Sequence, residues 1–573
     1  MKVLLTAVNA KYIHSNLAVY SLKACAAKYA GQVEIAEFTI NQQRDYILQE
    51  IYRKKPDILA FSCYIWNISC VLETAENLSR ILPETKIWLG GPEVSYGGEE
   101  LLSRHPELTG IMVGEGERTF PELLEHYLDK SRTLEQIPGI LYRNREGRLF
   151  CNPVSREYLS MDELPFIYSD MEPFANKIIY YESSRGCPFS CSYCLSSIDK
   201  RVRLRRPELV KGELQFFLEH QVPQVKFLDR TFNCNHRHAM EIWQYLLEHD
   251  NGITNFHFEI EADILTEEEL ELLGRMRPGL VQLEIGVQSV NPRTLEAVNR
   301  RTDFGRIARA VEKIASHHNI HQHLDLIAGL PFENLDSFRC SFDAVYRLHP
   351  QELQLGFLKV LKGSAMYEDA KRYGIVSRRE PPYEVLFTPW LSYDDILKLK
   401  AVEEMLEIYY NSRQFACTIQ ALEGIFASPF ELYEALAAFY AGKGLSGYSF
   451  SRLQRLELLR EFAHGAAPGK ERRMDEQLLK DLYLRENAKT RPEWAENQAG
   501  WKQEIASFYQ KEEQQHRYLP EYEGYTWKQM MKMTHLERFT LRQEGPEEYW
   551  LLFDYGQRDP LSRDARTVEV PVR

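Results

Sequence analysis

The stretch RGCPFSCSYC (185–194) decides how the rest of the chain is interpreted, because it brings Cys187, Cys191 and Cys194 into one short loop. The spacing is C-x3-C-x2-C, whereas the other cysteines are scattered singly along the chain. A structural zinc site normally has four ligands, often in C-x2-C pairs, and no second pair lies nearby. Three thiolates can instead hold a cubane iron–sulfur cluster with one open iron, while clusters that only carry electrons usually have four cysteine ligands. The loop therefore favours a cluster that binds a substrate or cofactor; zinc and three coincidental structural cysteines are the alternatives.

The cysteine loop follows the first of six strand-like stretches that alternate with helix-like stretches. This rhythm predicts a parallel, TIM-like partial (β/α)6 barrel over residues 177–365, with its chemistry at the carboxyl ends of the strands. The six stretches are IIYYESS (178–184), QVKFLD (224–229), NFHFEIEA (255–262), LVQLEIGVQS (280–289), HLDLIAGLP (323–331) and ELQLGFLKVL (352–361).

Residues 1–130 show the same alternation and predict a flavodoxin-like, doubly wound parallel sheet in an α/β fold. Two glycine-containing turns, Gly90-Gly91-Pro92 and Gly114-Glu115-Gly116, follow the fourth and fifth strands and would present bare backbone to a ligand at the sheet edge. The expected strands are VLLTAV (3–8), VEIAEFTI (33–40), ILAFSCY (58–64), KIWLGG (86–91) and GIMVGEG (110–116).

The remaining segments are a linker and a terminal domain. Residues 131–176 contain ILYRNREGRLFCN, which predicts a hairpin inside a connector. Residues 366–573 consist largely of polar amphipathic stretches, so we expect a mainly α-helical domain with a strand-like YWLLFDY near its end.

Composition excludes several classes of protein. The chain has 573 residues with 70 Lys plus Arg against 83 Asp plus Glu, a net charge of −13, and 44% hydrophobic residues. These values predict a folded multidomain protein without a general affinity for nucleic acid or for an anionic membrane surface. Neither a signal peptide nor a transmembrane stretch is recognised, so a cytoplasmic location is expected.

The loop GCPFSCSYC (186–194), at the first strand of a strand–helix barrel, resembles the radical S-adenosylmethionine (SAM) superfamily. This resemblance implies that the three cysteines hold a [4Fe-4S] cluster, whose open iron binds SAM and whose electron cleaves it to a 5′-deoxyadenosyl radical. Looser similarities occur in FLDRTFN (227–233), FEIEAD (258–263), GVQS (286–289) and DLIAGLP (325–331). The resemblance further implies SAM contacts for four residues, although polar residues at strand ends also cap helices or satisfy backbone groups. These four are Tyr193, Glu261, Gln288 and Ser289.

The order of domains resembles the cobalamin-binding, class B type of radical SAM enzymes. GGPEVS (90–95) and GEGE (114–117) resemble its corrin-facing loops. Many such domains ligate cobalt through D-x-H-x-x-G, whereas YIHSNL (12–17) keeps His14 but lacks the aspartate and the glycine. His14 is therefore a candidate ligand, and an open lower cobalt face is preferred. The expected cobalamin contacts besides His14 are Gly90, Gly91, Pro92, Ser95, Gly114, Glu115 and Gly116.

The functional hypothesis is a cobalamin-dependent radical SAM enzyme that methylates an unactivated centre of a small-molecule or natural-product substrate. Its electron would come from an external flavodoxin- or ferredoxin-type donor. One alternative is a rearrangement, ring contraction or cyclisation without methylation. Others are a cluster-based redox or cobalamin-sensing protein and a zinc-binding interaction protein. The C-terminal region resembles an appended domain of uncharacterised role, and the sequence identifies neither the substrate nor further catalytic residues.

One basic run close to the cysteine loop admits two interpretations. Lys200, Arg201, Arg203, Arg205 and Arg206 lie within seven residues. Such runs are usually solvated, but close to an active-site mouth they could hold a carboxylate or phosphate.

Overall fold

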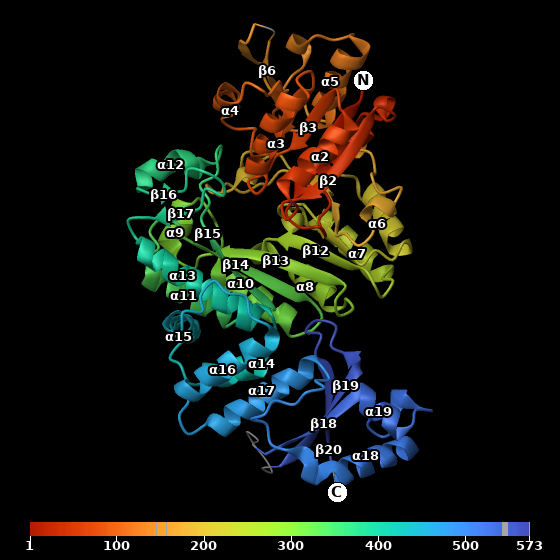
Figure 1. Ribbon diagram of the computed structural model, residues 1–573, viewed down its shortest axis with the longest axis vertical. Coiled ribbons are helices and arrows are strands. Elements are labelled where there is room, and N and C mark those ends of the chain that lie inside the picture. Colours follow the sequence, from red (N-terminus) through yellow and green to blue (C-terminus); the bar gives the residue numbers. More distant parts are fainter. Residues whose placement is uncertain (145, 156, 541–547, 572–573) are drawn as a thin grey trace.

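The computed structural model describes residues 1–144, 146–155, 157–540 and 548–571. Three bodies follow one another along the long axis: the N-terminal α/β domain, the barrel and the C-terminal region (Figure 1). Among the described residues, no helix is long and apolar enough to cross a membrane.

The N-terminal sheet has the strand order β2-β1-β3-β4-β5-β6-β7, and its first five strands are parallel. The order 2-1-3-4-5 is that of flavodoxin-like folds, so the predicted fold class is confirmed. β1 and β3 are buried along their whole length, as expected of strands covered on both faces. The parallel strands are β1 (Val3–Asn9), β2 (Val33–Thr39), β3 (Ile58–Ser62), β4 (Lys86–Gly90) and β5 (Gly110–Met112).

The predicted hairpin belongs to this sheet and is not a separate connector. β6 (Ile140–Arg143) pairs antiparallel with β5, and β7 (Leu149–Cys151) pairs with β6. Ile140, Leu141 and Tyr142 are all buried, so the strand covers apolar groups that β5 would otherwise expose.

Helices cover both faces of the sheet and create two apolar cores. Ile47, Val71 and Leu102 belong to one core, and Val19 and Phe120 belong to the other. The helices are α1 (Leu17–Cys25), α2 (Arg44–Lys54), α3 (Ile68–Ile81), α4 (Gly98–Arg104) and α5 (Gly116–Leu124).

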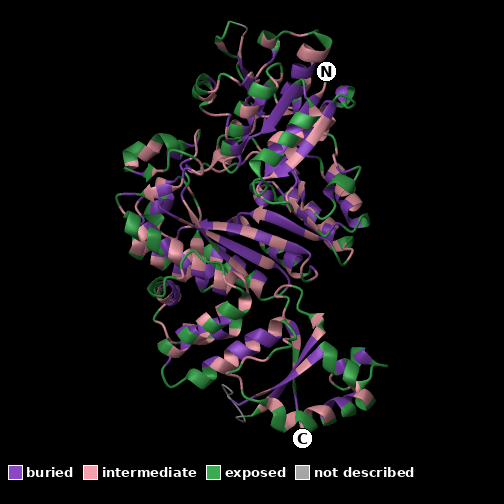
Figure 2. Ribbon diagram, in the orientation of Figure 1, coloured by how far each residue is buried: buried purple, intermediate pink, exposed green. Residues whose placement is uncertain are grey.

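The second sheet is a six-stranded, fully parallel partial barrel with the order β15-β14-β13-β12-β11-β8. All six predicted strands are present, and buried residues alternate with half-buried ones along β13 (Figure 2). The outward residues pack under helices, while the inward ones line the barrel. The strands are β8 (Ile179–Tyr181), β11 (Gln224–Phe227), β12 (Asn255–Ile260), β13 (Val281–Gln288), β14 (His321–Ala328) and β15 (Glu352–Phe357).

Most of the helices that alternate with these strands begin at side-chain caps, whereas α6 (Pro207–Glu219) begins without one. The side chains of the capping residues accept backbone N–H groups of the first helical turn and so terminate the preceding loops. Such caps are Asn235, Thr266, Asn291, Asp303 and Asn334. The helices are α6 (Pro207–Glu219), α7 (His236–Glu248), α8 (Glu267–Gly274), α9 (Pro292–Ala297), α10 (Phe304–Ala315), α11 (Leu335–Tyr346) and α12 (Ala365–Tyr373).

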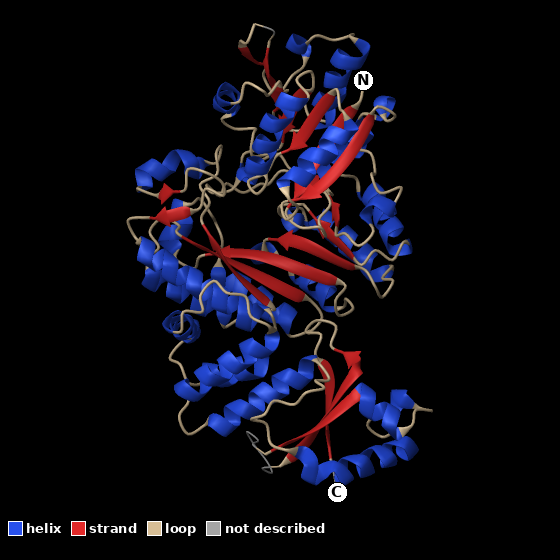
Figure 3. Cartoon of the chain, in the orientation of Figure 1, coloured by secondary structure: helices blue, strands red, loops and turns tan. Residues whose placement is uncertain are grey.

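The C-terminal region combines helices with a three-stranded antiparallel sheet (Figure 3). The strand-like YWLLFDY lies in the central strand of that sheet, so this region contains more strand than the stretch alone predicted. The strands are β18 (Thr534–Phe539), β19 (Tyr549–Arg558) and β20 (Ala565–Val570). The helices are α13 (Tyr393–Leu406), α14 (Ala416–Glu423), α15 (Pro429–Gly442), α16 (Arg452–Ala466), α17 (Glu471–Arg485), α18 (Lys502–Gln515) and α19 (Trp527–Met533).

Two short antiparallel pairs lie beside the barrel mouth. β9 (Ser184–Arg185) pairs with β10 (Arg203–Leu204) on either side of the cysteine loop. β16 (Val376–Ser377) pairs with β17 (Val385–Phe387) beyond the last barrel strand.

A seam of hydrogen bonds joins the N-terminal domain to the start of the barrel. The Ile178 N–H donates to the Ile13 carbonyl at 2.8 Å, and the Ser15 hydroxyl donates to the Ile178 carbonyl at 3.1 Å. Lys177 forms an ion pair with Glu37 at 2.6 Å. These contacts dock the first barrel strand against the loop after β1.

Candidate active site

A cavity of about 760 Å³ lies between the carboxyl edge of the N-terminal sheet and the cysteine loop, and we call it the domain-interface cavity. The two glycine turns line it, as the sequence predicted from their place after β4 and β5. Seven expected residues therefore share one cavity. They are Gly90, Gly91, Pro92, Ser95, Gly114, Glu115 and Gly116.

The domain-interface cavity continues into an apolar cleft. Leu5, Ala60 and Met112 of the sheet line one wall of this cleft, and Val19 and Leu22 of α1 belong to the other. An apolar extension of this kind suits a ligand with a hydrophobic or aromatic appendage.

Near the loop after β3, the cavity is lined by a stacked aromatic pair. The ring centroids of Tyr64 and Trp66 lie 4.3 Å apart with an interplanar angle of 10°. Together with the cleft, this wall makes the cavity suitable for a large, mostly planar ligand.

The adjacent positions 90 and 91 are occupied by glycine for different structural reasons. Gly91 has a φ of +110°, and a Cβ at this position would lie 2.6 Å from the Cys63 carbonyl oxygen. The turn therefore requires glycine at position 91. A Cβ on Gly90 would meet only the Met112 side chain, at an ordinary 3.6 Å. Position 90 therefore leaves room that a ligand can use.

The three loop cysteines surround a second cavity of about 230 Å³, the cysteine cavity. Cys187 and Cys191 are buried, and the Cys187 sulfur lies 3.5 Å from the Thr231 hydroxyl. Within the described part of the chain, no three His, Cys, Asp or Glu side chains are grouped so that they could hold a metal ion. A single zinc ion requires such a group, whereas a cubane cluster bonds each thiolate to a different iron. This arrangement disfavours the zinc alternative.

Carboxylates from the ends of the barrel strands line the cysteine cavity. Glu259, Glu261, Glu284 and Asp325 are there, against the two cations Arg230 and Arg300. Burial raises the pKa of Glu259 to about 7 and that of Glu261 to about 7, although the neighbouring arginines oppose the shift. A cavity with more carboxylates than cations suits a positively charged ligand.

Arg300 is a site residue that the sequence analysis missed. Its guanidinium donates to both Glu261 carboxylate oxygens, at 2.7 and 3.0 Å, and lies 3.7 Å from the Cys191 sulfur. It follows the short helix α9 and falls in none of the recognised stretches, so only the tertiary structure brings it to the cysteine loop.

The predicted SAM contacts divide into two groups. Tyr193, Glu261 and Gln288 line the cysteine cavity, and Tyr193 also lines the domain-interface cavity. The buried Gln288 Oε1 has no hydrogen-bond partner among the described residues. Ser289 does not line either cavity, because its hydroxyl is fully buried and donates to Glu333 at 2.6 Å. In this structure the Ser289 side chain satisfies the buried Glu333 carboxyl group.

His14 also lies outside the lining of the domain-interface cavity. Its Nδ1 is 2.6 Å from the Tyr180 hydroxyl, within the seam between the N-terminal domain and the barrel. This position agrees with the preference for an open lower cobalt face, and His14 as a cobalt ligand stays a prediction.

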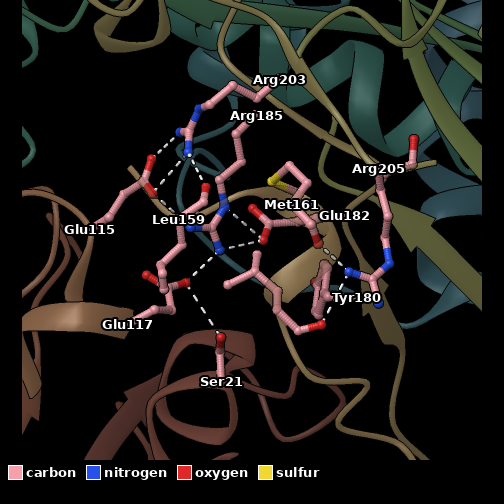
Figure 4. Close-up of polar contacts among 12 residues, drawn as sticks. Ser21, Glu115, Glu117, Leu159, Met161, Tyr180, Glu182, Arg185, Arg203 and Arg205 are labelled. Carbon is pink, nitrogen blue, oxygen red and sulfur yellow. Dashed lines mark hydrogen bonds and ion pairs between the residues drawn. The ribbon is translucent and has the colours of Figure 1, made fainter. Parts of the chain in front are cut away.

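A network of buried charges joins the second glycine turn to the cysteine loop (Figure 4). Arg185 lies two residues before Cys187, the first cysteine of the loop. Its guanidinium donates to Glu117 at 2.5 Å, to Glu182 at 2.8 Å and to Glu115 at 3.2 Å. Arg203 also pairs with Glu115. Glu115 and Glu117 flank Gly116, so the network fixes the glycine turn relative to the loop.

The basic run at 200–206 is mostly engaged within the chain. Arg201 pairs with Asp199, Arg205 with Glu213 and Arg206 with Asp162. Because these arginines and Arg203 already have carboxylate partners, the run does not form a free anion site.

The two cavities adjoin each other. Tyr193, Cys194, Ser196 and Arg230 line both of them and form what we call the shared wall. A ligand on the glycine turns and a ligand at the cysteines would therefore face each other across one layer of side chains.

Comparison with known families agrees with this organisation. Residues 3–124 match the B12 binding domain, residues 181–344 match the radical SAM superfamily, and residues 371–553 match a protein family of unknown function, DUF4080. The chain therefore contains a B12 binding domain, a radical SAM domain and a DUF4080 region, in this order.

Individual relatives cover parts of the chain. A 2-(S-pantetheinyl)-carbapenam-3-carboxylate methyltransferase from Streptantibioticus cattleyicolor is 27% identical over 50% of this chain and 44% of its own length. An anaerobic magnesium-protoporphyrin IX monomethyl ester cyclase from Rubrivivax gelatinosus is 23% identical over 54% of this chain and 58% of its own length. The chain spans about half the length of the first curated relatives that it matches.

A solved structure has the same fold. The radical SAM methyltransferase TsrM from Kitasatospora setae, with cobalamin and a [4Fe-4S] cluster bound, aligns with a TM-score of 0.57. The alignment covers 82% of this chain and 100% of that chain at 16% identity, so it supports the arrangement of domains.

Proposed function

We propose that this protein is a cobalamin-dependent radical SAM enzyme that methylates an unactivated centre of a small-molecule substrate. The observation that carries the proposal is the shared wall, because it sets a cavity on the glycine turns next to a cavity with three cysteines. In this proposal, residues 1–130 bind cobalamin, residues 177–365 bind the cluster and SAM, and the C-terminal region from 366 closes the far side of the barrel.

The domain-interface cavity fits cobalamin in shape and chemistry. The bare backbone at Gly90 and Gly114 offers a flat surface to a corrin ring, and the apolar cleft beside α1 can take an aromatic base. With His14 in the seam, no histidine lines this cavity among the described residues, which supports an open lower face of the metal.

The cysteine cavity fits a cluster with SAM. Cys187, Cys191 and Cys194 would hold three irons, while Glu261, Gln288 and Tyr193 would contact SAM. When bound, the cluster supplies the electron that cleaves the SAM sulfonium, and cobalamin carries the methyl group. The carboxylates around the cavity favour this cationic ligand, and Arg300 holds Glu261 in place.

The protein residues around the cavities position the reactants. Arg185 holds the glycine turn against the cysteine loop, and the shared wall keeps the two cofactor sites adjacent. An external flavodoxin- or ferredoxin-type protein would deliver the electron.

Anaerobic reconstitution with iron, sulfide and hydroxocobalamin tests the proposal. After desalting, we expect about four irons and one corrin per chain, and 5′-deoxyadenosine after addition of SAM and a reductant. A protein that binds the cluster without corrin would refute the methyltransferase assignment. A colourless protein with bound zinc would refute the whole proposal.

The similarity to the cyclase supports a second candidate, a cobalamin-dependent radical reaction without methylation. Both candidates use the same cavities, so the product separates them. Label transfer from methyl-labelled SAM into the substrate supports methylation, while an unlabelled product of altered structure supports cyclisation or rearrangement.

A further inference from the structure

The carboxylates that line the domain-interface cavity have close partners within the described part of the chain, whereas two of its cations do not. Of its three carboxylates, Glu115 and Glu117 are paired with Arg185, and Glu93 accepts the hydroxyl of Tyr383. Burial raises the pKa of Glu93, which reduces its negative charge further. All three carboxylates of this cavity therefore already have hydrogen-bond or ion-pair partners within the protein.

Two cations of the same cavity, Arg230 and Lys362, have no such close partner in the part of the chain that the structure describes. The Arg230 side chain is 54% exposed, and its ion pair with Glu259 spans 3.8 Å, too long for a hydrogen bond. Lys362 is half-buried and lies 5.3 Å above the Tyr383 ring, without an ion-pair partner among the described residues.

Hydrogen bonds hold the residues on either side of Arg230. Asp229 accepts the hydroxyls of Ser183 and Ser184 at 2.6 and 2.7 Å, and Thr231 contacts Cys187. The backbone after β11 is therefore held beside the cysteine loop, and it places Arg230 on the shared wall.

Lys362 approaches from the other side of the barrel. It follows β15, which is one edge strand of the sheet, while Arg230 follows β11, the strand next to the opposite edge. Both side chains line the domain-interface cavity, so a ligand in this cavity can face both cations.

We propose that Arg230 and Lys362 bind an anionic group of the substrate, a carboxylate or a phosphate. The inference rests on the proposed function, because a substrate must react between the two cofactor sites, where the shared wall lies. Arginine and lysine are the usual partners of both anions, and among the described residues neither cation has a carboxylate within hydrogen-bonding distance. The same chemistry could instead hold the phosphate in the nucleotide tail of cobalamin, and the experiment distinguishes the two.

The test uses inorganic pyrophosphate as the anion probe on the reconstituted protein, followed by titration calorimetry. We compare wild type with Arg230→Met, Arg230→Lys and Lys362→Met. The matched control is Arg206→Met, since Arg206 is exposed and paired with Asp162 outside both cavities. A charged hydrogen bond of about 1.5–3 kcal/mol corresponds to about 10- to 100-fold in affinity. We expect losses in this range for both Met variants, a smaller loss for Arg230→Lys and no change for the control.

A second arm compares cobalamin with cobinamide, which lacks the nucleotide and its phosphate. Unchanged affinities for both corrins in the Met variants, together with weaker pyrophosphate binding, support a substrate site. Weaker binding of cobalamin but not of cobinamide assigns the cations to the cofactor and overturns the proposal. Absence of pyrophosphate binding to wild type, or equal binding by all variants, also overturns it. Failure of the proposed function is visible separately, because the corrin or cluster absorption would then be missing.

Discussion

Replacing Arg185 with methionine tests whether the buried charge network holds the glycine turn to the cysteine loop. The Arg185 and Glu117 side chains are only 16% and 9% exposed, so the substitution removes one partner of a buried pair. Such a removal costs about 3–5 kcal/mol, because the remaining charge is left uncompensated. Glu115 keeps Arg203 as a partner, whereas Glu117 and the more exposed Glu182 both lose their cation. The more deeply buried Glu117 dominates the cost, so we expect about 3 kcal/mol.

The free energy of unfolding is measured by urea denaturation of the cofactor-free protein at pH 7, from the first transition. The double variant Arg185→Met/Glu117→Gln removes both charges and should be about 1 kcal/mol less stable than wild type, which makes it about 2 kcal/mol more stable than Arg185→Met alone. The single variant Glu117→Gln is measured as well, because the coupling between the two positions requires both single variants. Arg206→Met serves as the exposed control and should change stability by less than about 0.5 kcal/mol. Additive effects of the two substitutions, or an Arg185→Met variant as stable as wild type, would refute the reasoning.

The same variant should alter the pH dependence of stability. Burial raises the pKa of Glu117, but Arg185 outweighs this effect and the net shift is downward. In wild type, the Glu117 carboxylate therefore stabilises the folded state above a pH of about 4.5, which is its pKa in the unfolded chain. This stabilisation is lost as the pH falls through the lower pKa that Glu117 has in the folded state. Without Arg185, burial is the largest influence on the pKa of Glu117 and is opposed only by hydrogen bonds from Ser21 and the backbone. The difference in stability between variant and wild type should therefore narrow as the pH falls from 7 toward 4.5.

Three further outcomes are expected. Replacing the three loop cysteines together by alanine should abolish iron binding and leave cobalamin affinity unchanged; bound iron in that variant would contradict the cluster assignment. Gly91→Ala should destabilise the N-terminal domain by more than about 1 kcal/mol, because its Cβ meets the Cys63 carbonyl, whereas Gly90→Ala should keep the fold and weaken cobalamin binding; equal stabilities of the two variants would refute this distinction. With a pKa of about 7, Glu261 is mostly protonated at pH 6 and ionised at pH 8, so SAM affinity, measured by equilibrium dialysis, should rise up to about tenfold over this range. The rise should be smaller in Glu261→Gln, where Glu259 still titrates in the cavity near pH 7.

The sequence predicts those structural features that depend on residues close together along the chain. The strands of both parallel sheets follow from apolar runs, and the cysteine loop and glycine turns follow from local spacing. Arg300, Arg185 and Arg230 gain their roles from partners far along the chain, and single arginines carry no periodic signal. Ser289 and His14 lie outside both cavities and contact Glu333 and Tyr180, and a strand-end position alone does not reveal such partners.

Long-range pairing also explains the hairpin and the C-terminal sheet. A hairpin predicted from its turn has no preferred neighbour until β5 leaves an edge free for β6. In the C-terminal region, β18 and β20 pair on either side of β19 although each alone is a short amphipathic stretch. Whether a short strand joins a sheet is decided by the surface available to it.

The seam between the N-terminal domain and the barrel has a consequence for how the chain can be divided. Its bonds, from Ile178 to Ile13 and from Lys177 to Glu37, connect the two bodies directly, as does the pairing of Arg185 with Glu117. The segment at residues 130–133, which lies between α5 and the β6–β7 hairpin, is exposed for the most part and contributes little to these contacts. A backbone cut there should give two fragments that stay associated as a noncovalent pair, so the protein could be produced as a split enzyme whose halves reassemble.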